Sequence, residues 1–414
     1  MKWDVLVIGA GPVGSFTAER IARCGFSVLL VEENHTVGKP VQCAGLISPR
    51  ALNLTGVEHD LVLNKLKGLR VFSPLGASLH AESSRVFSLA IDRAALDKKL
   101  AIKAEDAGAV LLTNTRVTGL KPVPDGYSAT TVKGRKAFNI QARLVIGADG
   151  SNSKVAKWLN LDHKTPRAVM YAADVELPRE YTDTIDVFMG QGLAPGWFGW
   201  LIPLDKCTCR VGTGYAFVEP EHPPYYYFLQ MAEAFPEVFK GFKVIRHTGG
   251  IVPLGSLPKI FAPHAMLVGD AACQTKPISG GGIYTGLVAA QLCAETAVAA
   301  LYEDNLSEIR LAHYQELWNK AMGSELSCSM GFRESFLDFS DNDIEFLIKL
   351  LNRPKWLKAI LQYGDIDYPS FLASKLYLLH PLVKTFFHKV RHISSAPFYQ
   401  IYNKNCWTSP TVKD

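Results

Sequence analysis

The sequence has little of what marks secreted, metal-binding or membrane-spanning proteins. Its eight cysteines are spread over 414 residues, and the one close pair, Cys207 and Cys209, fits alternate positions of a strand. No signal peptide is evident, because glycines interrupt the apolar start almost at once. No run approaches about 18 uncharged apolar residues, since even the stretch after Ile283 carries Gln291 and Glu295. We therefore expect reduced thiols, no metal site, and a cytoplasmic protein that is soluble or peripheral to the cytoplasmic face of the membrane.

Strong charge is also lacking. The net charge of +5 is modest, no nucleic-acid motif accompanies it, and the chain holds no internal repeat or low-complexity segment. We therefore expect no nucleic-acid partner. The basic excess gathers in residues 375–413, which hold six Lys or Arg among aromatic residues and no Asp or Glu. Such a segment suits either an anionic membrane surface or a packed helical region with solvated lysines, and both interpretations stay open.

What is present begins with a glycine turn. Residues 5–8 form an apolar run rich in β-branched residues that breaks into Gly9, Gly11 and Gly14, where a parallel strand would turn into a helix. Gly9 permits the tight turn, Gly11 lets the backbone approach a pyrophosphate, and Gly14 lets the helix pack on the sheet. The phosphate charge would lie on the helix N-terminus.

A second strand, residues 26–31, ends at Glu32, 18 residues after Gly14. A carboxylate at this position accepts hydrogen bonds from the hydroxyls of an adenosine ribose. Strand, helix, second strand and acid in register predict a dinucleotide site, and the acid favours FAD or NAD over NADP.

The segment 267–283 decides between FAD and NAD. An apolar strand ends at Gly269 and Asp270, and a glycine run, 280–282, opens an apolar, alanine-rich helix from Ile283 to about Leu301. In flavoproteins of this plan the Asp holds the ribitol chain. The helix start faces the pyrimidine ring, where unpaired N–H groups and the positive end of the helix dipole stabilise negative charge on reduced flavin. We therefore expect FAD.

Two further positions fit the same plan. Residues 144–150 are a strand and turn that resemble the Asp-Gly signature of aromatic-hydroxylase-type flavoproteins, in which Asp149 would lie close to the cofactor and to nicotinamide. Arg93 matches the Arg that this superfamily directs at the cofactor. The alternative for Arg93 is a solvated charge on a helix.

The predicted fold is α/β, or α+β overall: a Rossmann-type FAD-binding domain with an inserted β-sheet substrate domain and a C-terminal helical region. The FAD-binding domain is discontinuous, built from residues 1–68, 90–160 and 258–302. The substrate domain comprises 69–89 and 168–256, where strand-like patterns alternate with turns. Residues 303–414 form the helical region.

The assembled motifs resemble the geranylgeranyl reductase family over nearly the whole chain. The loop 39–45 matches a family loop in which a Cys follows Pro-Val and faces the flavin. The segment 195–203 with 211–214 matches the family's aromatic-Gly-Trp-x-x-Pro strand and its partner; 249–253, 352–354 and 363–365 are supporting matches. The chain departs from the family after Cys43, where Ala44 replaces the Gly of the Cys-Gly-Glu-Gly or Cys-Gly-Gly-Gly that related lipid reductases often carry. That departure bears on the substrate's head group and on the mobility of the loop.

The resemblance implies reduction of isolated double bonds in a geranylgeranyl-type lipid or quinone side chain, with hydride from reduced flavin N5 and a proton from a group near Cys43. It also implies an external reductant, NAD(P)H or ferredoxin. The alternatives are a buried small hydrophobe for Cys43 and core packing for the tryptophans. The residues expected to contact the prenyl substrate are Trp197, Phe198, Trp200 and Pro203. The residues expected to contact FAD are Gly9, Gly11, Val13, Gly14, Glu32, Glu33, Cys43, Ala44, Arg93, Val117, Asp149, Asp270, Gly281, Gly282 and Ile283.

A flavin monooxygenase or halogenase is the competing function, because one scaffold hosts several chemistries. The run from Phe198 through Trp200 to Ile202 and Pro203 is one residue from the Trp-x-Trp-x-Ile-Pro signature of flavin halogenases. A flavin-binding protein without catalysis is a third hypothesis, for which the sequence gives no positive support.

Overall fold

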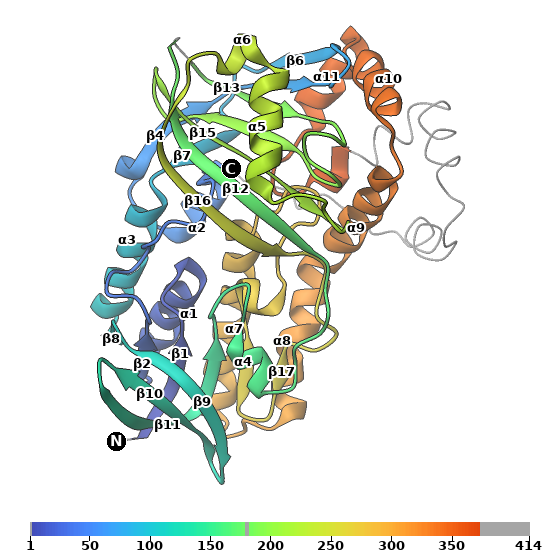
Figure 1. Ribbon diagram of the computed structural model, residues 1–414. Coiled ribbons are helices and arrows are strands. Elements are labelled where there is room, and N and C mark those ends of the chain that lie inside the picture. Colours follow the sequence, from blue (N-terminus) through green and yellow to red (C-terminus); the bar gives the residue numbers. More distant parts are fainter. Residues whose placement is uncertain (1, 179–181, 373–414) are drawn as a thin grey trace, which may run out of the picture.

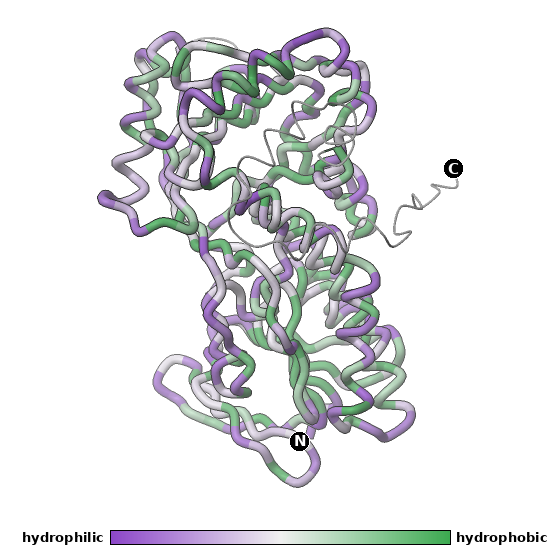
Figure 2. The backbone as a smooth tube through the Cα atoms, turned by 90° about the vertical axis from the view of Figure 1, so that its right-hand side faces the viewer, coloured by the Kyte–Doolittle hydropathy of each residue, from purple (hydrophilic) through white to green (hydrophobic). Residues whose placement is uncertain are grey.

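The computed structural model describes residues 2–178 and 182–372, which form two lobes, one above the other in Figure 1. Figure 2 shows hydrophobic segments running through the interior of both lobes and hydrophilic loops at their tips. The basic, aromatic stretch 375–413 lies outside the described residues, so its membrane-surface and packed-helix interpretations both stay predictions.

The lower lobe in Figure 1 is built on a mixed sheet whose central strands are parallel. Val5, Leu6 and Val7 are fully buried, as expected for a central strand covered on both faces. In sheet order the strands are β17 (Phe261–Ala262), β18 (Ala265–Leu267), β11 (Lys136–Gly147), β1 (Lys2–Ile8), β2 (Val28–Val31) and β8 (Val110–Leu112), and the hairpin of β9 (Arg116–Val123) and β10 (Gly126–Lys133) pairs with β11.

Helices pack around this sheet. α1 (Pro12–Ala22) packs between α3 (Arg93–Asp106) and α7 (Ile283–Tyr302), and α8 (Glu308–Trp318) packs on α7. The remaining short elements of this region are α2 (Pro49–Thr55), the 3₁₀ turns His59–Leu61 and Gly269–Ala272, and α4 (Lys154–Trp158).

α7 is more apolar than we expected from the sequence, in which no run approaches the length of an uncharged membrane-spanning segment. Within the described residues it is the one helix long and apolar enough to cross a membrane by length and composition, although Gln291 and Glu295 interrupt it. Of its most apolar window, 61% is buried inside the protein. A buried core helix passes the same composition test, so α7 is weak evidence for a membrane span.

The upper lobe contains a second sheet, whose outer face is covered by α5 (Pro224–Ala234) and α6 (Pro236–Phe239). Phe188, Leu201 and Val211 pack there against Phe228 and Phe239. In sheet order the strands are β16 (Lys243–Pro253), β12 (Arg167–Glu176), β15 (Thr208–Ala216), β14 (Gly199–Pro203), β13 (Thr184–Phe188), β5 (Gly68–Phe72) and β6 (Ser78–Glu82). A small sheet of β3 (Leu46–Ile47), β7 (Ser88–Ile91) and β4 (Val62–Leu66) is separate from both.

The C-terminal helices lie against the free edge of the second sheet. After α8, a π-helical turn (Asn319–Gly323) leads into α9 (Ser324–Leu337), α10 (Asp341–Leu351) and α11 (Pro354–Tyr363). Ile344 and Ile348 of α10 pack on Leu79 and Ala81 of β6. The helices therefore form a wall opposite the inner face of β5, β6 and β13.

Glu345 is the polar contact that fixes α10 to the β5–β6 turn. Its carboxylate accepts hydrogen bonds from the Ser73 hydroxyl and, at 3.0 Å, from the Ala77 N–H, and it pairs with Lys349 at 2.7 Å. The hydrogen bonds from Lys349 and Ser73 lower the pKa of Glu345 from 4.5 to about 2. The folded state therefore favours the ionised carboxylate.

We predict a pH-dependent loss of stability in Glu345→Gln. A folded pKa below the unfolded value stabilises the protein above pH 4.5, and this contribution is lost as the pH falls toward about 2. The difference in Tm between wild type and Glu345→Gln should be largest above pH 4.5 and should vanish near pH 2. Thermal unfolding across this range measures it, with Glu334→Gln on the surface of α9 as the control. A Tm difference independent of pH would show that the carboxylate charge does not hold α10.

Candidate functional site

A cavity of about 1230 Å³ lies between the lobes and takes its walls from both. It exceeds the roughly 300–1,000 Å³ of ordinary small-molecule pockets, so it has room for a dinucleotide beside a second ligand. The predicted site residues that line it are Gly9, Gly11, Val13, Gly14, Glu32, Glu33, Cys43, Ala44, Arg93, Val117, Asp149, Asp270, Gly281, Gly282, Ile283, Trp197, Phe198 and Trp200.

Pro203 is the predicted site residue that does not line the cavity. Side chains alternate between the faces of a strand, and β14 directs Trp200 and Ile202 into the cavity, while Leu201 packs under α5 on the outer face. Pro203 falls in the alternation with Leu201. Ile202, one residue before Pro203, is the residue of this pair that lines the cavity.

The glycine turn after β1 has the geometry that a pyrophosphate needs. Gly9 has φ +103, and a Cβ there would collide with the Ala148 carbonyl. A Cβ on Gly14 would collide with the Gly9 carbonyl, so this glycine allows α1 to pack closely. Nothing lies within 4 Å of the Cβ position of Gly11, which leaves its backbone open to a ligand at the N-terminus of α1.

Glu32 is buried at the end of β2 and is held by its neighbours. Its Oε2 accepts from the Ala10 N–H at 3.0 Å, and Oε1 accepts from the Asn34 N–H at 2.9 Å and from Asn34 Nδ2 at 2.8 Å. A carboxylate offers about four lone-pair sites, so one acceptor position remains for a ligand hydroxyl. Glu33, in contrast, has an exposed side chain.

The carboxyl ends of three adjacent parallel strands meet beside the glycine turn. Asp149 follows β11, and its carboxylate accepts from Ser153 Oγ at 2.6 Å and from the Lys154 N–H at 2.7 Å, so it caps α4. Asp270 follows β18, and a Cβ on Gly282 would lie 2.9 Å from its Oδ1. Burial raises the pKa of Asp270, and Arg93 opposes that shift. A half-buried acid thus adjoins the N-terminus of α7.

Arg93 is largely buried, with 15% of its side chain exposed, rather than a solvated helix charge. Its Nε and Nη2 donate to Asp97 at 2.8 and 3.0 Å. Burial alone would lower the pKa of Arg93, but Asp97 and Cys43 beside it raise the pKa. Two of the predicted site residues, Arg93 and Cys43, therefore lie together.

The loop that carries Cys43 is held from two sides. The Gly45 N–H donates to Cys43 Sγ at 3.3 Å within the loop. From the second sheet, Arg210 Nη1 donates to the Ala44 carbonyl at 2.9 Å, and Thr248 Oγ1 donates to a carbonyl of the same loop at 2.8 Å. The upper lobe thus holds the loop that carries Cys43.

Arg210, which is buried, is itself anchored by an ion-pair network that reaches the surface at Arg246. It pairs with Asp174 at 2.7 Å, and Asp174 also pairs with Arg246 at 2.7 Å. Burial would raise the pKa of Asp174, but the two arginines lower it. The network keeps a charged donor aimed at the Cys43 loop.

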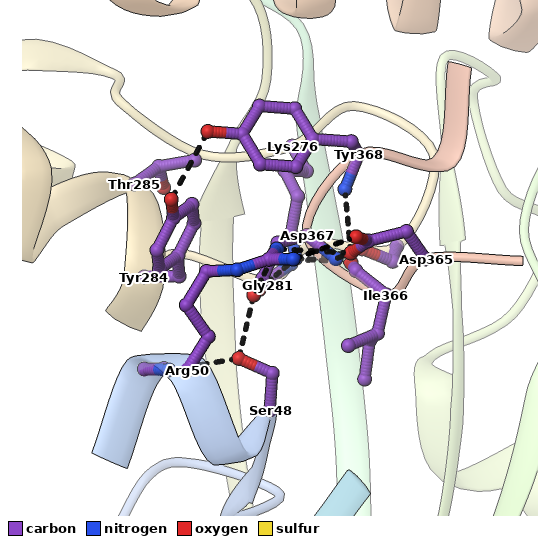
Figure 3. Close-up of polar contacts among 12 residues, drawn as sticks. Ser48, Arg50, Lys276, Gly281, Tyr284, Thr285, Asp365, Ile366, Asp367 and Tyr368 are labelled. Atoms are coloured by element: carbon purple, nitrogen blue, oxygen red, sulfur yellow. Dashed lines mark hydrogen bonds and ion pairs between the residues drawn. The ribbon is translucent and has the colours of Figure 1, made fainter. Parts of the chain in front are cut away.

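The sequence did not predict a polar cluster that joins α2, the segment before α7 and the segment after α11 (Figure 3). Lys276 precedes the glycine run, and its side chain is 5% exposed. Its Nζ donates to the Ile366 carbonyl at 2.5 Å and lies 3.4 Å from Asp367 Oδ1. Burial lowers the pKa of Lys276, and Asp367 offsets part of that shift. Residues 273–282, which lead into α7 and form the cofactor loop, therefore contribute a lysine that is paired with an acid following α11.

The same cluster extends to α2. Asp367 Oδ2 accepts from Ser48 Oγ at 2.5 Å and from Arg50 Nη1 at 3.3 Å, while Arg50 also pairs with Asp365 at 2.9 Å. The Arg50 guanidinium lies over the Tyr368 ring at 5.4 Å. These contacts tie the segment after α11 to the start of α2 and to the cofactor loop (Figure 3).

Arg333 of α9 is a second buried cation beside the cofactor loop. It donates to the Pro277 carbonyl at 3.2 Å, to the Ile278 carbonyl, and to the Gly196 carbonyl at 3.0 Å, and its guanidinium lies 4.2 Å from the Trp197 ring centre. Burial lowers its pKa to about 9, and within the described residues no carboxylate pairs with it.

The sequence carried only a faint signal for these residues. Lys276 stands in the polar run before the glycines, but its partner Asp367 lies 91 residues away. Arg333 lies in a helix whose other buried residues are mostly apolar. Charges that are buried by distant segments cannot be told from surface charges by spacing alone.

Comparison with known proteins matches these features. The family model described as FAD binding domain matches residues 2–215. Digeranylgeranylglycerophospholipid reductase 1 of Methanothermobacter thermautotrophicus is 34% identical over 83% of this chain and 88% of its own length. A geranylgeranyl bacteriochlorophyll reductase-like protein of Thermoplasma acidophilum has a TM-score of 0.84 at 23% identity, covering 94% of this chain and 99% of its own. The flavin-dependent brominase Bmp2 shares the fold, with a TM-score of 0.70 at 14% identity over 91% of this chain and 99% of its own.

We predict that Glu32→Ala weakens FAD binding by roughly 1 to 3 kcal/mol, because the change removes a charged acceptor and leaves the buried Ala10 N–H without its partner. Fluorescence titration of apoprotein with FAD measures the change. Glu105→Ala on the surface of α3 is the control and should bind within about 0.5 kcal/mol of wild type, since Glu105 is exposed and does not line the cavity. Equal affinities in Glu32→Ala and wild type would contradict a role in dinucleotide binding.

Proposed function

Since this chain belongs to the family of FAD-dependent digeranylgeranylglycerophospholipid reductases, we propose that it saturates isolated double bonds in the prenyl chains of a lipid or of a quinone side chain. The observation that carries the proposal is the two-part cavity. One part is lined by the glycine turn, Glu32 and the start of α7, and the other is lined by the inner face of the second sheet and by α9 to α11.

The chemistry divides between the cofactor and the chain. Bound reduced FAD supplies a hydride from N5, and the chain must exclude water, hold the alkene and deliver a proton to its other carbon. No carbonyl polarises an isolated alkene, so its position over the ring matters most. Trp197, Phe198 and Trp200 wall the cavity beside the cofactor loop, where the Trp197 ring lies 3.2 Å from the Cβ position of Gly280.

We propose Cys43 as the proton donor or as the group that positions it. The thiol lies in a loop fixed by Arg210 and Thr248, and Arg93 lies beside it. Loop, thiol and apolar wall meet in one cavity. An apolar wall together with a thiol suits protonation of a hydrocarbon in a water-poor space.

A flavin monooxygenase or halogenase is the second candidate. It rests on the shared fold and on the run from Phe198 to Pro203, in which Phe198 stands where halogenases carry Trp. Phe198 stacks on Trp197 with ring centres 5.0 Å apart. Likeness of fold does not fix the chemistry.

We predict that photoreduced holoenzyme, incubated without oxygen with geranylgeranyl lipids, adds two hydrogen atoms per double bond, as measured by mass spectrometry of the extract. Parallel reactions with NAD(P)H and with reduced ferredoxin identify the electron donor, for which both are proposed. Incorporation of oxygen in air, or of halogen when halide is present, in place of hydrogen would establish the second candidate and overturn the reductase proposal.

We predict that Cys43→Ala binds FAD nearly as wild type does but loses most prenyl reduction, because the thiol handles a proton rather than the cofactor. Cys43→Ser should retain slight activity, since a hydroxyl can relay a proton but is a much weaker acid. FAD affinity and single-turnover reoxidation by substrate are the two measurements. Cys207→Ala, an exposed thiol away from the cavity, is the control. Full turnover in Cys43→Ala would make Cys43 a packing residue.

A further inference from the structure

The far part of the cavity has an apolar corridor with a basic rim. Antiparallel pairing sets Leu69 opposite Ala81 on β5 and β6, and the bond from the Ser83 N–H to the Lys67 carbonyl, 3.0 Å, continues the ladder by one pair. Cross-strand neighbours on one face have Cβ atoms about 4.5–5.5 Å apart. Lys67 and Ser83 therefore lie side by side at the end of the sheet.

Both residues line the cavity. Lys67 shares a face with Leu69 and Val71, and Ser83 shares a face with Ala81; all five line the cavity. Along β5 and β6, the cavity-lining side chains are therefore polar at one end, at Lys67 and Ser83, and apolar from there on. Phe336, Phe339, Leu347, Ile360 and Leu361 of the helical wall line the opposite side.

Arg85 completes the rim from the sheet side. Arg85 is exposed and lines the cavity, and its Nη2 donates to the Leu361 carbonyl at 3.3 Å and to the Gly364 carbonyl at 3.2 Å, which holds the guanidinium at the end of α11. A guanidinium has five N–H donors, so donors remain for a ligand.

No carboxylate neutralises these two cations in the described part of the chain. No ion pair joins Lys67 or Arg85 to an acid there, and the acids that follow α11, Asp365 and Asp367, are taken by Arg50 and Lys276. Two unmatched cations and a hydroxyl at the rim of an apolar corridor suit a ligand with an anionic head and a hydrocarbon chain.

We propose that Lys67, Ser83 and Arg85 form the subsite for a phosphate or diphosphate head group, which anchors the prenyl substrate while its chain runs along the β5–β6 face toward the cofactor loop. This inference rests on the proposed function. The shared chemistry is a phosphate ester, and its source is either a prenyl diphosphate or a prenyl phospholipid.

The test measures ligand binding to oxidised holoenzyme by quenching of flavin fluorescence, so no turnover is needed. The probes are geranylgeranyl diphosphate, a digeranylgeranylglycerophospholipid in mixed micelles, and neutral geranylgeraniol, which has the same chain without the charge. Lys67→Ala and Arg85→Ala should each weaken binding of an anionic probe about tenfold and leave geranylgeraniol within about twofold. Lys67→Arg should restore most of the affinity.

Lys65→Ala is the matched control, because Lys65 is an exposed lysine two residues away that does not line the cavity. FAD content and Tm of every variant show that the fold is intact. The anionic probe that binds more tightly identifies the source of the head group, and either one supports the subsite.

Two results would overturn the subsite: equal affinity of wild type for geranylgeraniol and for both anionic probes, or equal losses for neutral and anionic probes in Lys67→Ala and Arg85→Ala. Failure of the proposed function is distinguishable. In that case charge-selective binding would persist, but no hydrogen would be added to any probe.

Discussion

Three neighbouring parallel strands bring the residues of the cofactor site together. β18, β11 and β1 are neighbours in one sheet, so the residues that follow them, Gly269 and Asp270, Asp149, and Gly9, meet at one edge although they lie far apart in sequence. Two helix N-termini, of α1 and α7, open at that edge, and glycines allow the close packing there: a Cβ on Gly286 of α7 would collide with Val13 of α1. Neither helix could approach the other with larger residues at these points. The anion-binding ends of both helices therefore face the same space.

Two arginines tie the second lobe to the loops that surround this edge. Arg210, paired with Asp174, reaches the Ala44 carbonyl, and Arg333 bridges Gly196 of the second lobe to Pro277 of the cofactor loop. These are buried cations bound to backbone carbonyls, so their geometry is specific, and loss of one would leave polar groups without partners in a water-poor space. Rigid contacts of this kind suit a reaction in which position over the ring, rather than polarisation of the substrate, lowers the barrier.

Local signals made much of the fold predictable. The glycine turn, the acid after β2 and the glycine run before α7 each lie within a few residues of the strand or helix that they define, so their spacing carries the structure. The face of a strand on which a side chain lies, and the burial of a charged residue, were harder to predict from the sequence. Pro203 was placed in the substrate wall, yet a shift of one residue along β14 moves a side chain to the other face. The pairing of Lys276 with Asp367, and the burial of Arg333, depend on segments brought together only by the tertiary fold.

The cations around the cavity fall into two kinds: those paired with a carboxylate, which have a structural role, and those without such a partner, which can act on a ligand. Arg93, Arg210, Arg50 and Lys276 each have a carboxylate partner, so they add little net field to the cavity. Arg333 has no such partner in the described residues, and it lies against the carbonyls of Pro277 and Ile278, just before the N-terminus of α7. A buried cation without an acid is costly unless something else in its surroundings bears negative charge. Beside a helix N-terminus it adds to the positive potential already present, so this wall favours a ligand that gains negative charge during its chemistry, as a flavin does on reduction.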